Sequence, residues 1–195
     1  MASRFPPIPE SEFTPAQETA YSEAIRVVRE AFGSSFSLTD STGALLGPFA
    51  VLMYTPNTLT PYLQHTASVL LKSQLSARER ELATLSVVSI TKAEYIRYAH
   101  MKIGIAVGLS QEQVEGAVAG KEDLGLEERE KAVYDIALEM GRNYGRLSDE
   151  SWERGRETLG REGMAALSQV VASYLHSSVL VNLAEVQVPK NDAEK

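Results

Sequence analysis

Helix-initiation motifs constrain the fold of this chain more than any other feature of its sequence. A Ser or Thr followed three residues later by Glu or Gln occurs at Thr14, Ser76 and Ser110. In this arrangement the hydroxyl caps a free backbone amide, and the longer side chain reaches back to the capping residue. After Thr14, Tyr21 and Ile25 begin an apolar stripe at helical spacing, whereas alternation with a period of two is nearly absent from the chain. The sequence therefore predicts an all-α domain without a convincing sheet.

About six or more helices are expected. Their predicted ranges are 14–33, 60–70, 78–91, 93–107, 127–145 and 161–185, with a further start at Ser110. The longest non-helical piece, FGSSFSLTDSTGALLGPF, is too apolar around Leu45, Leu46 and Phe49 for a solvated linker. A buried loop or short helix is the simpler interpretation, and a substrate lid is the functional one. Residues 1–11 and 190–195 are expected to be flexible tails of a single domain spanning 1–195.

Composition excludes several classes of function. The 195 residues carry a net charge of −7, which disfavours nucleic-acid binding and offers no broad basic surface for anionic lipids. The absence of cysteine excludes disulfides, thiolate metal sites and thiol catalysis. The start, MASRFPPIPESEF, has prolines where a signal peptide needs an apolar run, and no stretch is expected to span a bilayer. A cytoplasmic protein without a membrane or nucleic-acid partner is therefore expected.

A glutamate stands on an apolar helix face in the central pair of predicted helices, residues 78–107. Glu81 shares its face with Leu82, Leu85 and Val88. A buried and unpaired carboxylate costs about several kcal/mol, so Glu81 is expected to have a partner. The structural alternative is an ion pair with Arg78 or Arg80, of which Arg78 lies three residues earlier on the same side.

The second candidate of this hairpin is His100, which shares an apolar face with Ile96 and Ile103. A core histidine is one interpretation. However, Glu81 lies about ten residues before the turn near Thr91 and His100 about eight after it, so at ~1.5 Å per residue both reach a similar depth. A carboxylate that orients an imidazole is a common acid–base arrangement. Glu81 and His100 are thus the candidate catalytic pair.

Four further residues are candidate substrate ligands. Arg97 is suited to hold a carboxylate by two parallel hydrogen bonds, and Tyr98 to donate one. Glu94 lies one helical turn from both, and the simpler interpretation of Glu94 and Arg97 is a surface ion pair. His65 is expected at the core or its rim. No histidine spacing typical of a metal site is present, so neither a metal nor another cofactor is expected.

Three segments resemble the carboxymuconolactone decarboxylase-like, alkylhydroperoxidase D-like family. They are LLGPFAVLMYTPNT, LSARERELATLSVVSITKAEYIRYAHMKIGIAVGLSQEQVEGA and LSDESWERGRETLGREGMAALSQVVASYLHSSVLVNLAEVQVP. In the redox branch of that family a glutamate precedes a C-x-x-C pair, and a histidine follows four residues after the second cysteine. In this chain the resemblance places that glutamate at Glu81 and that histidine at His100, with Ala93 and Ile96 at the cysteine positions. The resemblance thus implies the glutamate and histidine of a thiol peroxidase site without its two cysteines.

The resemblance implies an alkylhydroperoxidase D-like helical bundle that forms trimers or hexamers. A homo-oligomer is also expected because residues 161–185 are apolar on more than one side. Since Ala and Ile cannot attack a peroxide, the decarboxylase branch is the nearer comparison. It implies a cofactor-independent lyase or isomerase acting on a small oxygenated acid or lactone, without peroxidase activity. A non-catalytic family member that binds a small molecule or builds an oligomer is the alternative.

Overall fold

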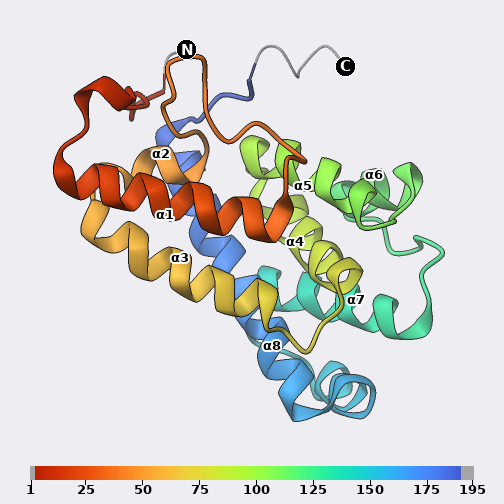
Figure 1. The fold of residues 1–195 in the computed structure, drawn as a ribbon. Helices are drawn as coiled ribbons and strands as arrows, with labels where there is room; N and C mark the ends of the chain where they lie inside the picture. Colours follow the sequence, from red (N-terminus) through yellow and green to blue (C-terminus); the bar gives the residue numbers. More distant parts are fainter. Residues whose placement is uncertain (1–2, 190–195) are drawn as a thin grey trace.

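A computed structural model describes residues 3–189, and within them all regular structure is helical (Figure 1). The only β pairing in this range is an isolated bridge between Thr39 and Leu45. The all-α prediction is confirmed. The helices are α1 (Pro15–Phe32), α2 (Pro48–Leu52), α3 (Pro56–Leu71), α4 (Ala77–Thr91), α5 (Glu94–Ala106), α6 (Gln111–Ala119), α7 (Glu128–Arg142) and α8 (Asp149–Ala184), preceded by a 3-10 turn, η1 (Glu10–Glu12).

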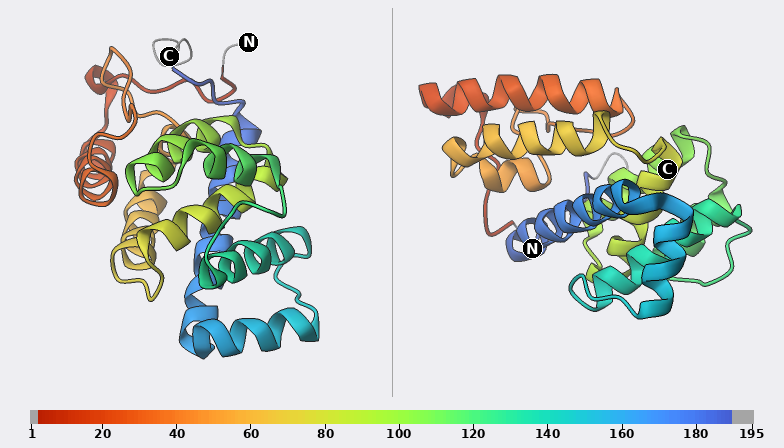
Figure 2. Two further views of the ribbon diagram at one scale, coloured as in Figure 1. Left: turned by 90° about the vertical axis from the view of Figure 1, so that its right-hand side faces the viewer. Right: turned by 90° about the horizontal axis from the view of Figure 1, so that it is seen from below.

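The central element is α4, which packs against α5, α6, α7 and α8. From Leu82 to Ser89 every residue of α4 is buried, as expected of a helix with neighbours on all sides. On the other side of α8, α1 lies alongside α3, and α2 contacts both α3 and α8 (Figures 1 and 2). The hairpin of α4 and α5 therefore faces the layer formed by α1, α2 and α3, with α8 running between them.

The three predicted initiation motifs all form complete capping boxes. The Thr14, Ser76 and Ser110 side chains accept hydrogen bonds from the backbone amides three residues later, and the side chains at those positions return the bond. Capping of this kind depends only on residues three apart, which explains why the starts of α1, α4 and α6 were predictable.

One helix start was predicted wrongly, because a proline lies inside a longer helix. The third helix begins at Pro56 rather than at Thr60, and Pro61 lies within it. The missing Pro61 amide deprives the Asn57 carbonyl of its intrahelical partner, but Asn57 is exposed and water can serve instead.

The last helix, α8, consists of two segments joined at a kink. The backbone of Gly160 is non-helical, with φ at +70° and ψ at 174°, so a second segment begins directly after it, where the start near Arg161 was predicted. The sequence prediction missed the segment before the kink, residues 149–159.

Within the described residues, the segment before α1 makes several contacts with the rest of the fold, and the flexibility expected for residues 1–11 stays a prediction. The backbone amide of Arg4 donates to the carbonyl of Ala184 (2.9 Å), and the Tyr54 hydroxyl donates to the carbonyl of Pro6 (2.8 Å). Phe5 also packs edge-on against Tyr54, with ring centroids 5.4 Å apart. These contacts tie residues 3–6 to α8 and to the end of α2. The predicted tail at 190–195 lies outside the described residues.

Within residues 3–189, α8 is long and apolar enough to meet the length and hydropathy criteria for a membrane span. The sequence analysis missed this, although no charged residue occurs between Glu162 and Glu185. Half of the apolar window is buried against other helices. Core helices pass the same test, so the finding is weak evidence for a membrane span.

Candidate active site

Glu81 and His100 meet in the core, at the depth predicted from the helix hairpin. Glu81 Oε2 lies 2.7 Å from His100 Nδ1. Their side chains are only 4% and 6% exposed. Because Nδ1 is engaged with a carboxylate, the imidazole orientation is fixed, and Nε2 is the ring nitrogen that remains for another partner.

The structural alternative for Glu81 was wrong, because Arg78 and Arg80 have other partners. The Arg78 guanidinium forms a bidentate pair with Glu130 of α7, with its shorter contact at 2.7 Å, and also donates to the carbonyl of Gly108. Glu81 is therefore available to His100 alone among the partners considered from the sequence.

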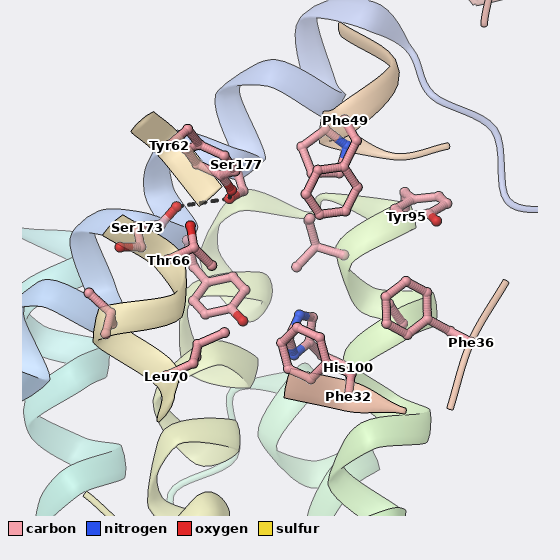
Figure 3. A pocket seen from close by; sticks show the side chains of 15 residues that line it. Phe32, Phe36, Phe49, Tyr62, Thr66, Leu70, Tyr95, His100, Ser173 and Ser177 are labelled. Carbon is pink, nitrogen blue, oxygen red and sulfur yellow. Dashed lines mark hydrogen bonds between the residues drawn. The ribbon is translucent and has the colours of Figure 1, made fainter. Parts of the chain in front are cut away.

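A cavity of about 50 Å³ adjoins the imidazole of His100 (Figure 3). No hydrogen bond from His100 Nε2 occurs within the described residues, and this atom is not among their buried unpaired polar atoms. The ring nitrogen is therefore accessible from the cavity. The walls come from α1, the following loop, α2, α3, α5 and α8, through Phe32, Phe36, Pro48, Phe49, Tyr62, Thr66, Val69, Leu70, Tyr95, Ile96, Ala99, His100, Ser173, Tyr174 and Ser177.

Two aromatic rings hold the imidazole edge-on. Tyr174 of α8 lies 4.7 Å from His100 between ring centroids, and Phe32 of α1 lies 5.8 Å away. Burial, and secondly the negative charge of Glu81, raise the pKa of Tyr174 well above its usual value, so its hydroxyl stays protonated. Tyr174 is a positioning residue that the sequence analysis missed.

Hydroxyl groups gather on the wall formed by α3 and α8 (Figure 3). The hydroxyls of Tyr62 and Ser177 lie 2.7 Å apart and share a hydrogen bond. The buried Thr66 Oγ1 is near enough to Tyr62 to lower the pKa of the phenol, against the larger rise caused by burial, yet it makes no hydrogen bond of normal geometry. An unpaired buried hydroxyl costs about 1–3 kcal/mol, so Thr66 offers an unused polar contact to a ligand or water.

The loop between α1 and α2 closes the cavity and is tied to α5. The Tyr95 hydroxyl donates to the Ser37 carbonyl (2.9 Å), and the Ser37 amide donates to the Tyr98 hydroxyl (3.2 Å). Gly47, at φ +65°, lies against the Tyr95 ring, where an added Cβ would come within 2.2 Å of a ring carbon. Tyr98, a predicted substrate ligand, thus holds the loop in place and is not among the residues that line the cavity.

The other predicted substrate ligands lie outside the cavity. Arg97 and Glu94 form an exposed pair at 3.4 Å on the far side of α5, as the simpler interpretation proposed. His65 is exposed and lies 3.3 Å from the Ser173 hydroxyl, which itself lines the cavity. His176 is exposed and packs against Tyr62, with ring centroids 5.3 Å apart. The structure therefore brings together Glu81 and His100 but none of the other four candidates.

No group of three or more His, Asp or Glu side chains within residues 3–189 is arranged to hold a metal ion. The cavity wall contributes hydroxyls, aromatic rings and a single imidazole. The arrangement is suited to moving a proton at Nε2 and to hydrogen bonding a small ring.

Comparison with known proteins supports the family predicted from the sequence. The model of the carboxymuconolactone decarboxylase family matches residues 56–139, which include Glu81 and His100. The fold is that of the alkylhydroperoxidase D-like proteins, and the predicted resemblance is confirmed. The walls supplied by Phe32, Phe49 and Tyr174 lie outside the matched segment.

Particular solved structures share this fold at low sequence identity. A peroxidase-related protein with an alkylhydroperoxidase core from Ralstonia eutropha JMP134 superposes with a TM-score of 0.79 at 16% identity, covering 98% of this chain and 95% of that one. The debrominase Bmp8, as a variant in complex with 2,3,4-tribromopyrrole, gives 0.76 at 13% identity over 100% and 96%. A peroxidase-related protein from Silicibacter sp. TM1040 gives 0.71 at 17% identity over 92% and 89%. A search of curated protein sequences gave no match.

Proposed function

We propose that this chain is a cofactor-independent lyase or isomerase in which His100 transfers the proton and Glu81 orients it. The observation that carries the proposal is the buried 2.7 Å contact between Glu81 Oε2 and His100 Nδ1 beside a cavity. A carboxylate on Nδ1 keeps the hydrogen on that nitrogen, which leaves the Nε2 lone pair to act as a base. General acid–base groups of this kind contribute about 10²–10⁴-fold in rate.

The proposed reaction moves one proton between two carbons of a small carbonyl compound, such as a lactone. His100 Nε2 accepts a proton from the carbon next to the carbonyl, and the electron pair of the broken C–H bond forms a dienolate. Glu81 stabilises the resulting imidazolium across 2.7 Å. The imidazolium returns the proton to the far carbon of the dienolate, and the double bond moves into conjugation. In the decarboxylase variant of the reaction, loss of carbon dioxide generates the carbanion, and the imidazolium form of His100 protonates it.

The comparisons support this proposal at the level of class. The family model covers both members of the pair, and the family is named after a decarboxylase. The debrominase neighbour holds a five-membered ring compound, which supports a small ring as the ligand here. Thiol chemistry is excluded because the chain has no cysteine.

Isomerisation of α-angelica lactone, a β,γ-unsaturated lactone, tests the proposal. Incubation in D₂O with NMR detection should show deuterium incorporation and formation of the conjugated isomer faster than in buffer. His100→Gln should lower this rate about 10²-fold or more, and Glu81→Gln should also lower it. The matched control is His65→Gln, an exposed histidine outside the cavity, which should keep the wild-type rate. Turnover unchanged in folded His100→Gln protein would eliminate His100 as the proton-transfer group.

A non-catalytic family member that binds a small molecule or only builds an oligomer is the second candidate, and the small size of the cavity favours the oligomeric scaffold. A volume of about 50 Å³ leaves room for little beyond solvent until the wall moves. A member of the binding kind would bind a ring compound without exchanging its protons. The D₂O experiment separates the two candidates, because only the enzyme incorporates deuterium.

Self-association as a trimer or hexamer, in the cytoplasm, is also part of the proposal. Val179 and Leu183 of α8 are 64% and 52% exposed, on a stretch without charged residues. Exposed apolar side chains on such a stretch are typical of a contact between subunits.

A further inference from the structure

Among residues 3–189, no Lys, Arg, Asp or Glu side chain lines the cavity. Its ionisable groups are His100 and the phenols Tyr62, Tyr95 and Tyr174. A positive charge on His100 is matched by the carboxylate of Glu81 directly behind it. With a neutral imidazole the pair is negative, and with an imidazolium it is neutral, so the pair never adds net positive charge to the site, and no lysine or arginine among the described residues lines it.

Arg80 lies outside the cavity, but its positive charge acts on Tyr174 in the cavity wall. Its positive charge lowers the pKa of Tyr174, but less than burial and the charge of Glu81 raise it. The Arg80 guanidinium donates to the carbonyl of Leu75 (2.7 Å), and Arg80 does not line the cavity. It therefore cannot form the direct ion pair that a bound carboxylate requires.

Negative charge is unfavourable inside this cavity. Burial is the largest influence on Tyr62, Tyr95 and Tyr174, and it raises the pKa of each phenol. The same desolvation would act on a ligand carboxylate, which loses its hydration and gains no cation in return. A neutral hydrogen-bonding group loses much less on entry.

We propose that the site selects a neutral ring compound with one O–H, N–H or acidic C–H group directed at the lone pair of His100 Nε2, and that it rejects anions. A second polar substituent would reach Thr66, whose buried hydroxyl has no hydrogen bond within the described residues. The aromatic rings of Phe32, Phe36 and Phe49 provide the apolar walls (Figure 3). The proposal rests on the proposed function for the role of His100, and it favours the lactone over the acid among the substrates expected from the sequence.

Size restricts the ligand further. A cavity that takes up benzene has a volume of about 150 Å³, whereas this one has about 50 Å³. A single ring therefore enters only when the loop carrying Phe36 moves outward. Fused or heavily substituted rings require a larger movement.

Binding of fluorinated probes, followed by ¹⁹F NMR, tests the charge selection without any turnover. The probes 4-fluorobenzamide and 4-fluorobenzoate have nearly the same shape and differ in charge. At neutral pH the amide should bind at least about 10-fold more tightly, since the anion pays for uncompensated desolvation. Equal affinity, tighter binding of the benzoate, or no binding of either probe would overturn the proposal.

Two variants of Val69, a half-buried wall residue on α3, provide the matched test of the cause. Val69→Lys places an ammonium group at the rim and should raise benzoate affinity relative to benzamide by about 10-fold, whereas Val69→Met should keep the wild-type preference. If the lysine variant does not shift the preference, missing positive charge is not the reason for it. The wild-type comparison stands even if a variant fails to fold.

The hydrogen bond to His100 is tested with 4-fluorophenol and 4-fluoroanisole, which differ in the O–H group. Wild type should prefer the phenol, and His100→Leu should remove this preference. If the wild type binds neutral probes selectively but does not isomerise the lactone, the proposed function is wrong and the charge selection stands. If it isomerises the lactone but binds anions equally well, the charge selection is wrong and the proposed function stands.

Discussion

Replacing His100 by leucine should show how much His100 stabilises the buried charge of Glu81. Leucine keeps the bulk and apolar contacts but leaves the Glu81 carboxylate, 4% exposed, without its partner at 2.7 Å. Removing one member of a buried pair costs about 3–5 kcal/mol when the other stays charged. The free energy of unfolding at neutral pH should fall by this amount.

The second change, Glu81→Gln on the leucine background, should restore part of the loss. It removes the unpaired charge and leaves a buried amide, whose missing hydrogen bonds cost about 1–3 kcal/mol. The double variant should therefore be more stable than His100→Leu by about 2 kcal/mol. If the two substitutions acted independently, Glu81→Gln would lower the stability of the His100→Leu variant further. A gain in stability would therefore show that the two side chains are coupled.

Urea unfolding measures the stability of the wild type, of His100→Leu and of the double variant. The protein concentration is kept fixed, because self-association would otherwise change the apparent stability. Glu30→Gln on the exposed face of α1 is the control, since Glu30 pairs with Arg26 in solvent at 3.0 Å and should change stability by less than about 0.5 kcal/mol. A double variant no more stable than His100→Leu would refute the argument that Glu81 is left as a buried, unpaired charge.

Three further predictions concern chemistry, assembly and pH. Metal-free protein should not turn over hydroperoxides with a dithiol reductant, because the chain has no thiol; reductant-dependent turnover would contradict this. Light scattering at micromolar concentration should show a homo-oligomer, and Val179→Glu with Leu183→Glu should reduce its size; a monomeric wild type would be inconsistent with the proposal. Hydrogen bonds from Ser151, and secondly from Ser148, hold the pKa of Glu139 in the folded protein below its usual value. The charged carboxylate therefore stabilises the fold at any pH above the pKa that Glu139 has in the unfolded chain. This stabilisation is lost as the pH falls through the lower pKa of the folded protein. Glu139→Gln should therefore cost about 1 kcal/mol at neutral pH in urea titrations and nothing below both pKa values, and a cost independent of pH would refute the assignment.

Local signals in the sequence predicted the helices well, and distances along the helix hairpin predicted where Glu81 and His100 meet. Capping boxes and helical rise depend on residues close in sequence, so they can be interpreted without a structure. The start of α3 was misjudged because the helix continues through Pro61 despite this unfavourable residue. The kink at Gly160 ends one helical segment and begins another, and only the second segment was predicted.

The rest of the site could not be predicted because it is assembled from distant segments. Phe32, Phe49 and Tyr174 lie on α1, α2 and α8, and they meet His100 or its cavity only in the folded chain. No spacing rule links them to the hairpin. Arg97 and Glu94 were selected for their chemistry, but their helix positions point them to solvent.

The attachment of Ser37 to α5 determines how the cavity exchanges its contents. One residue of the loop provides both the carbonyl that accepts from Tyr95 and the amide that donates to Tyr98, so lifting Ser37 away breaks the two bonds together. Amide hydrogen exchange at Ser37 therefore counts openings of the wall. The residence time of a bound ring is therefore expected to depend on the Tyr95 and Tyr98 hydroxyls that hold Ser37, of which Tyr98 does not line the cavity, so a change at Tyr98 can alter the exchange rate without altering a contact to the ligand.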